Sequence, residues 1–157
     1  MIKKKLIYLD TNVYSGLTED TSHIHRVEGE RLIRFAMHND VKIISSKLVT
    51  YEIDRAPNEV KNKYFEIISK LNIDELPFNV KAIDDLVRFY VFKGILTKRN
   101  IRDAKHIAIA TYYQTDALIS WNFDDIVNLS KIPRILKANN EKGFEKSFMI
   151  ISPLEVR

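Results

Sequence analysis

Short apolar runs alternate with amphipathic stretches along this chain, and that alternation limits the possible folds more than any other feature. We expect strands at residues 6–9, 41–44, 117–121 and 148–151. We expect helices at about residues 27–39, 45–57, 58–71, 79–93, 101–114 and 124–129. Continuous apolar runs are typical of strands that are buried on both faces. The pattern therefore predicts an α/β fold, with a parallel sheet flanked by helices on both faces.

Length and composition indicate one domain inside the cell. The 157 residues contain no repeat, low-complexity tract or Gly/Ser linker, so we expect a single domain over residues 1–157. The chain has no cysteine, which excludes disulfides and thiolate metal sites and suits a reducing compartment. The apolar run Leu6–Leu9 is too short for a signal peptide, and no segment approaches the roughly 20 apolar residues of a membrane span. We therefore expect a cytoplasmic protein without a membrane partner.

The charge of the chain is only a weak indication of its partners. There are 25 Lys and Arg residues against 21 Asp and Glu residues, which gives a formal net charge of +4. This mild excess is compatible with a polyanionic partner, and equally with a solvated surface that binds none.

Polar residues follow two of the expected strands where each one ends. Asp10, Thr11 and Asn12 follow the first strand, whereas Ser120 and Asn122 lie at the end of the strand over residues 117–121, with Asp124 just beyond. In open α/β sheets the functional crevice lies outside the carboxyl ends of the strands. These residues could all belong to that crevice, although Asp10, Asn122 and Asp124 could instead cap the helices that follow.

Two further carboxylates occur where an apolar residue would be expected. Glu52 lies within the apolar stripe of its helix, which also carries Leu48, Val49 and Ile53. An inward carboxylate must be paired, protonated or bound to a metal, because desolvating a lone charge is costly. A buried ion pair would explain Glu52 equally well.

Asp103 repeats this pattern in a second helix. It lies in the first turn of the strongly apolar helix over residues 101–114, on the side of Ile107 and Ala110. The helix macrodipole favours a carboxylate at this end, which is the alternative explanation. Because the same anomaly occurs in two helices and beside a strand-end Asp, we interpret these acids as one site.

The candidate ligands are all oxygen donors. Carboxylate and amide oxygens suit Mg²⁺ or Mn²⁺ better than zinc, and such ions support phosphodiester hydrolysis. The histidines add little: His23 and His25 have no evident third ligand, and His106 is more readily explained as a packed or surface residue. The chain has no glycine-rich phosphate loop and no sign of a Ser–His–Asp or Cys–His arrangement.

Four short segments, in order, resemble the motifs of the PIN-domain nucleases. They are Leu9–Asn12 (LDTN), the surroundings of Glu52 (VTYEI), Arg102–Ala110 (RDAKHIAIA) and Leu118–Phe123 (LISWNF). The resemblance covers nearly the whole chain and implies a PIN-like fold with a Mg²⁺- or Mn²⁺-dependent endoribonuclease site that hydrolyses RNA phosphodiester bonds. Small members of the family are often VapC-like toxins of bacterial toxin–antitoxin pairs, which implies a protein antitoxin over the crevice and a homodimer through the early helices.

The resemblance also implies roles for individual residues. Asp10, Glu52 and Asp103 would be the catalytic and metal-binding acids, with Asn122 at the fourth metal-binding position. The residues expected to contact substrate are Thr11, Asn12, Lys98, Arg99, Arg102, Ser120 and Asp124. Many family members carry Asp where this chain has Asn122, so we expect one well-held ion and leave a second open. The basic cluster just before Asp103 could also be an ordinary solvated loop.

Two other functions stay open at this point. A catalytically degenerate member of the family would bind RNA or protein without cutting, and Asn122 favours that alternative. A phosphatase with Asp10 as nucleophile would need a second Asp two residues later, where this chain has Asn12.

Overall fold

A computed structural model describes residues 3–18 and 22–157. Its strands are β1 (Lys5–Leu9), β2 (Val41–Ser46), β3 (Asp74–Leu76), β4 (Ala117–Ile119) and β5 (Met149–Ile151). Its α-helices are α1 (Thr11–Ser15), α2 (His23–His38), α3 (Lys47–Ile53), α4 (Asn58–Lys70), α5 (Lys81–Phe92), α6 (Ile101–Tyr112) and α7 (Ile132–Glu141). Two 3₁₀ helices are η1 (Lys98–Asn100) and η2 (Pro153–Glu155).

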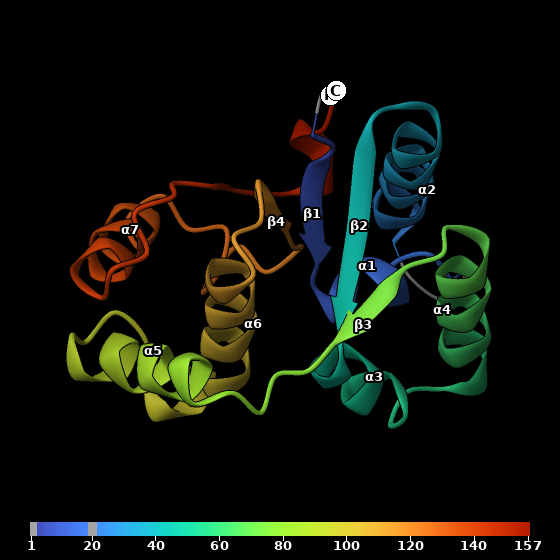
Figure 1. The fold of residues 1–157 in the computed structure, drawn as a ribbon. Coiled ribbons are helices and arrows are strands. Elements are labelled where there is room, and N and C mark those ends of the chain that lie inside the picture. The colour runs from blue at the N-terminus through green and yellow to red at the C-terminus, as the bar shows by residue number, and fades with distance from the viewer. Residues whose placement is uncertain (1–2, 19–21) are drawn as a thin grey trace.

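The five strands form one sheet in the order β3-β2-β1-β4-β5, and every neighbouring pair is parallel. β1 lies at the centre, where Ile7 is in register with Ile43 of β2 on one side and Ala117 of β4 on the other. The carboxyl ends of the strands therefore meet at one edge, at the lower end of the sheet in Figure 1. The predicted α/β class with a parallel sheet is confirmed.

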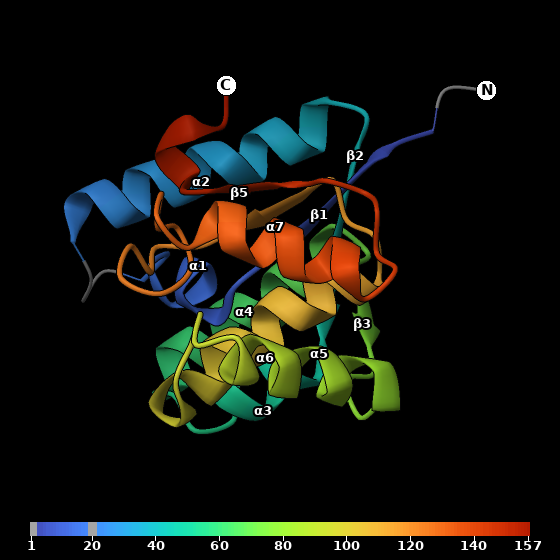
Figure 2. The same cartoon turned by 90° about the vertical axis from the view of Figure 1, so that its left-hand side faces the viewer.

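Helices cover both faces of the sheet (Figure 1). Helices α2 and α4 lie on one side, whereas α5, α6 and α7 form the layer on the other, which Figure 2 shows from outside. Helix α3 lies below the carboxyl ends of β2 and β3. This arrangement brings α1, α3 and the first turn of α6 close to the end of β1, where the candidate acids were expected.

The central elements are buried as their sequences predict. Tyr8 and Leu9 of β1 have no exposed surface, as expected of a strand covered on both faces. In α6, Ala104 and the segment from Ile107 to Ala110 are likewise fully buried. Small alanines among the isoleucines let α6 pack closely between the sheet and α5. Among the described helices, none combines the length and apolar composition needed to cross a bilayer.

The structure corrects the prediction of a helix over residues 124–129, where it has only turns. The side-chain Oδ1 of Asn122 accepts hydrogen bonds from the backbone N–H groups of Asp124 and Asp125 at 3.2 and 3.0 Å. This starts a helical turn, but Asn128 accepts from the N–H of Ser130 at 3.0 Å and begins a new one. Competing Asn side chains thus break the segment into turns. The sequence prediction also missed α1, β3 and α7.

Candidate active site

Asp10 lies directly after β1 and is the most buried of the candidate acids, with 5% of its surface exposed. Its backbone N–H donates to the carbonyl of Ile119 at 3.0 Å, which extends the pairing of β1 with β4 by one residue. Its Oδ2 accepts hydrogen bonds from Ser120 Oγ at 2.7 Å and Asn12 Nδ2 at 3.1 Å. These two donors fix the orientation of the carboxylate.

A second set of bonds joins the ends of β1 and β4. The Oδ1 of Asn12 accepts from the backbone N–H of Trp121 at 3.0 Å, and its Nδ2 also lies 3.1 Å from Ser120 Oγ. The same hydroxyl oxygen accepts from the N–H of Asn122 at 3.0 Å. The predicted site residues Asn12 and Ser120 therefore lie beside Asp10 and hold it in place.

Glu52 reaches the same place from α3, and its side chain is only 16% exposed. Its Oε1 accepts hydrogen bonds from Thr11 Oγ1 at 2.9 Å and from His106 Nε2 at 2.6 Å. Burial by itself raises the pKa of Glu52, but the hydrogen bond and charge of His106, together with the Thr11 bond, lower it below its usual range. Glu52 is therefore a carboxylate at neutral pH, directed inward as its place on the apolar stripe predicted.

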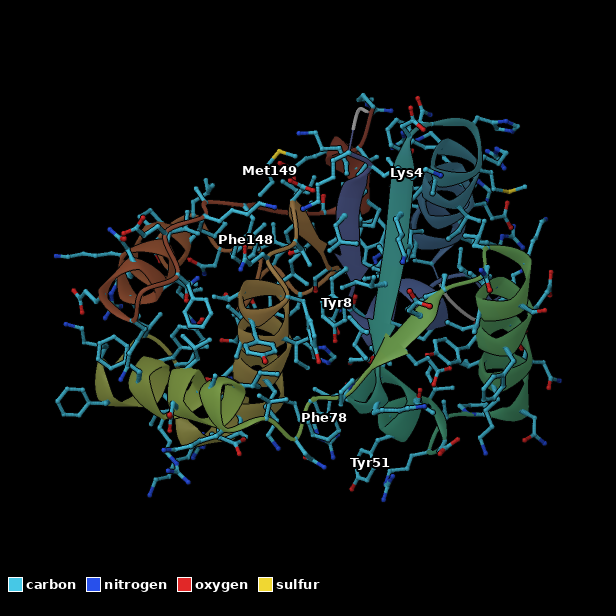
Figure 3. The ribbon with its side chains drawn as sticks, viewed as in Figure 1. Lys4, Tyr8, Tyr51, Phe78, Phe148 and Met149 are labelled. Carbon is cyan, nitrogen blue, oxygen red and sulfur yellow. The ribbon has the colours of Figure 1, made fainter. Side chains whose placement is uncertain are left out.

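His106 is the site residue that the sequence interpretation left out. It is 1% exposed, and its Nε2 also lies 3.4 Å from Asp10 Oδ1, so one imidazole edge faces two carboxylates. Its Nδ1 lies 2.8 Å from the hydroxyl of Tyr8, which Figure 3 labels between the sheet and α6. Burial lowers the pKa of His106, but Asp10 and Glu52 outweigh it and raise the pKa above its ordinary value.

The signal for His106 was present in its spacing. It lies three residues after Asp103, on the same face of α6. If Asp103 faces inward, the side chain at position 106 must therefore also lie near the site. The residue type was ambiguous, because a buried histidine far from any acid has the same spacing.

Asp103 is half-buried in the first turn of α6. Burial, followed by the negative charges of Asp10 and Asp125, raises its pKa to about 6, against the charge of His106 and a hydrogen bond from Asn122. Burial is the larger cause of the shift, and the charges of Asp10 and Asp125 add to it.

The residues after β4 divide between the site and its surroundings. Asn122 contacts Asp103 through its side chain and caps the following turn through its Oδ1. Asp125, rather than the predicted Asp124, is the residue whose charge acts on Asp103. Asp125 is itself held by Lys131, at 2.6 Å, and by Asn100 Nδ2, at 3.0 Å, whereas Asp124 is exposed.

The predicted basic residues line a groove that opens beside the acids. Lys98 and Arg99 of η1, with Arg102 of α6, share this groove of about 660 Å³ with Glu52 and Asp103. A capping box, in which Thr97 and Asn100 bond to each other's backbone, fixes the turn that carries Lys98 and Arg99. The cluster therefore borders the same groove as the two acids, with its side chains exposed to solvent.

The oxygen ligands of the site are of the kind that a hard divalent cation prefers. In the structure, however, two of the carboxylates are paired with His106. Asp10, Glu52 and Asp103 offer carboxylate oxygens and Asn122 an amide oxygen, which are the ligands that Mg²⁺ and Mn²⁺ prefer. As the side chains stand, no three His, Asp or Glu residues within residues 3–18 and 22–157 are arranged to hold one ion. When protonated, His106 would place a positive charge between Asp10 and Glu52, so a metal would compete with it for these oxygens.

No protein-family model, curated protein or solved structure matches this chain. The site joins Asp10, Glu52 and Asp103, which come from three distant segments of the chain, and adds His106 between the first two.

Proposed function

We propose that this chain is a Mg²⁺- or Mn²⁺-dependent endoribonuclease of the PIN-domain family. The observation that carries the proposal is the convergence of Asp10, Glu52 and Asp103 at the carboxyl edge of a parallel sheet. Crowded carboxylates are a poor surface for an RNA phosphate unless a cation offsets their charge. A divalent ion held by these residues and Asn122 would supply that charge and activate water for attack on phosphorus.

The surrounding bonds suggest separate roles for the acids. Asp10 is fixed by Ser120 and Asn12, which suits a ligand that must not move. Glu52 has one oxygen engaged by Thr11 and His106, and we assign it to binding the ion or orienting the attacking water. Asp103 borders the groove, where it would meet both ion and substrate.

His106 would act as a positioning residue in this scheme. Its imidazole holds Glu52 at 2.6 Å and faces Asp10 at 3.4 Å, so it separates two carboxylates that would otherwise repel each other. The Tyr8 hydroxyl, which lies 2.8 Å from Ser46 Oγ, supports the ring from behind.

The resemblance to small PIN-domain proteins suggests the toxin half of a toxin–antitoxin pair. An antitoxin would then cover the acidic crevice, and a homodimer would form through the early helices. Exposed Ile24 and Val27 on α2 provide apolar surface for such a dimer. Both partners are tested by size measurement, alone and with the product of a small neighbouring gene; a monomer that binds no such product would refute them.

The test of the enzymatic proposal is cleavage of structured RNAs with Mg²⁺, Mn²⁺ or EDTA, beside an Asp10→Asn variant of equal size. Cleavage that needs metal and disappears in the variant would support the proposal. Cleavage by both proteins, or cleavage in EDTA, would refute this site or this metal dependence.

A degenerate module that binds RNA or protein without cutting it is the second candidate. The ion pairs of His106 with Asp10 and Glu52, together with the neutral Asn122, favour it, because they balance charge without a metal. RNA binding without cleavage, and without any metal-dependent rise in melting temperature, would support this alternative.

A further inference from the structure

We propose that the groove between α3 and α6 is a stacking site for unpaired nucleotides, with the bases on Tyr51 and Phe78 and the phosphates on the basic wall. The inference rests on the proposed function, because it names the form of RNA that this site would take. Phe78 lies outside the motifs considered above, and Tyr51, which lies next to Glu52 in the VTYEI segment, has had no role assigned to it. Their side chains are labelled in Figure 3 at the lower end of the molecule, below the sheet.

The walls of the groove come from four segments of the chain. Helix α3 contributes Tyr51 and Glu52, and the segment between β3 and α5 contributes Phe78. The remaining wall is η1 and the first turns of α6, which include Asp103. A strand of RNA lying in this groove would therefore have a phosphate next to the acids while its neighbouring bases lie near the two rings.

Tyr51 is held as an exposed ring. It is 46% exposed, and the Arg55 guanidinium lies over its ring at 3.7 Å from the centroid. Arg55 Nη1 also donates to the carbonyl of Tyr51 at 3.0 Å, which fixes the guanidinium in place. A tyrosine whose orientation is set by a stacked arginine loses little entropy when a base binds to it.

Phe78 also has a cation beside its ring. It is partly buried, and Lys105 Nζ lies 5.8 Å from its ring centroid. Each aromatic ring thus has a cation beside it. Aromatic rings next to Lys and Arg side chains are the usual elements of single-strand binding, where rings stack on bases and cations follow the backbone.

The basic wall carries more positive charge than the acids of the groove can balance. It consists of Lys98, Arg99, Arg102 and Lys105, against the two carboxylates of Glu52 and Asp103. Within the described residues none of these four cations forms a salt bridge, although Arg102 lowers the pKa of Glu52 through space. Phosphates are the partner that complements such a wall.

The rings favour unpaired RNA over a duplex. In a duplex the bases stack on one another and their faces are covered, so Tyr51 and Phe78 would gain no contact. Charge alone would hold both forms. Preference for single strands that depends on the two rings is therefore the specific consequence of the proposal.

The experiment measures binding of the full-length protein in EDTA, so that no cleavage interferes. The probes are a fluorescein-labelled single-stranded oligoadenylate, the same strand with abasic positions, and a duplex of equal length. The variants are Tyr51→Ala, Phe78→Ala and Arg99→Ala, with Phe65→Ala as control, because Phe65 is comparably exposed, at 48%, but lies on α4 outside the groove.

We expect the intact single strand to bind about tenfold more tightly than the abasic strand, and each ring variant to remove most of that difference. Arg99→Ala should weaken both strands by a similar factor, and Phe65→Ala should change neither. Equal affinity for all three probes, or ring variants that match Phe65→Ala, would overturn the proposal. Metal-dependent cleavage is measured separately: stacking without cleavage would refute only the nuclease function, and cleavage without stacking only this site.

Discussion

Replacing Asp103 with Asn should make the metal-free protein more stable, although we expect it to abolish activity. Asp103 lies among the carboxylates of Asp10 and Asp125 and is half-buried, so its charged form is disfavoured. The amide in Asp103→Asn has nearly the same shape as the carboxylate. The variant therefore removes a partly buried charge and its repulsion, and leaves the packing of α6 in place.

The expected gain follows from the pKa of Asp103, which rises from 3.8 to about 6 on folding. Each pKa unit corresponds to about 1.36 kcal/mol, so the upper bound is about 3 kcal/mol. Because Asp103 is only partly buried, solvent screening reduces this to about 1.5 kcal/mol. Loss of the favourable charge at the helix N-terminus subtracts about 0.5 kcal/mol. A net gain of about 1 kcal/mol remains at neutral pH.

The gain should also depend on pH. Between pH 3.8 and 6 the folded protein holds more protons at Asp103 than the unfolded chain, so the free energy of unfolding of the wild type falls as pH rises. The difference between variant and wild type should therefore be complete by pH 7.5 and shrink on acidification to pH 5.

Urea unfolding at both pH values, with EDTA present, would measure the difference. Asp84→Asn is the matched control, since Asp84 also lies in the first turn of a helix but is exposed, and that variant should be slightly destabilised. An Asp103→Asn variant that is less stable than wild type at pH 7.5, or a difference that does not narrow at pH 5, would refute the account of charge crowding.

Four further measurements test the rest of the site. His106→Ala should lower the free energy of unfolding by about 3 kcal/mol in urea, because Asp10 and Glu52 would lose the charge between them; an unchanged midpoint would contradict this. In the wild type, the raised pKa of His106 means that its stabilising contribution is complete below about pH 6.5 and is lost as pH rises through the folded pKa, which a pH series of melting temperatures would detect. Ser120→Ala should cost about 1 to 2 kcal/mol in urea and slow RNA cleavage, since Asp10 loses a donor and the N–H of Asn122 its acceptor. Mg²⁺ at ten times its dissociation constant should stabilise the wild type by about 1.4 kcal/mol in thermal melts and leave Asp10→Asn unchanged.

The fold was predictable where burial alone dictates the sequence. The run Leu6–Leu9 identifies β1 because a central parallel strand is covered on both faces, and the apolar circumference of α6 identifies a buried helix for the same reason. β3 has three residues, Asp74–Leu76, at the edge of the sheet, and so short a polar strand carries no periodic signal. The prediction of a helix after Asn122 was wrong because hydrogen bonds from side chains, which helix propensity does not describe, favour turns there.

The site was partly predictable because burial of charge is expensive enough to leave a mark in the sequence. Glu52 and Asp103 interrupt apolar helix faces, and both lie inside, beside Asp10. His106 interrupts the same face of α6 as Asp103, yet only the folded chain shows that its Nε2 lies between Asp10 and Glu52.

The protonation of Asp103 and His106 offers a test of whether this site binds a metal. Asp103 and His106 both hold protons more tightly in the folded chain, so the metal-free site keeps positive charge close to its carboxylates. A bound cation would take over that task, and its binding should then release protons. In a metal site, Mg²⁺ binding and protonation are coupled, so adding Mg²⁺ should release protons. A self-sufficient ion-pair network that binds no metal would release none, so measuring proton release on adding Mg²⁺ distinguishes the two.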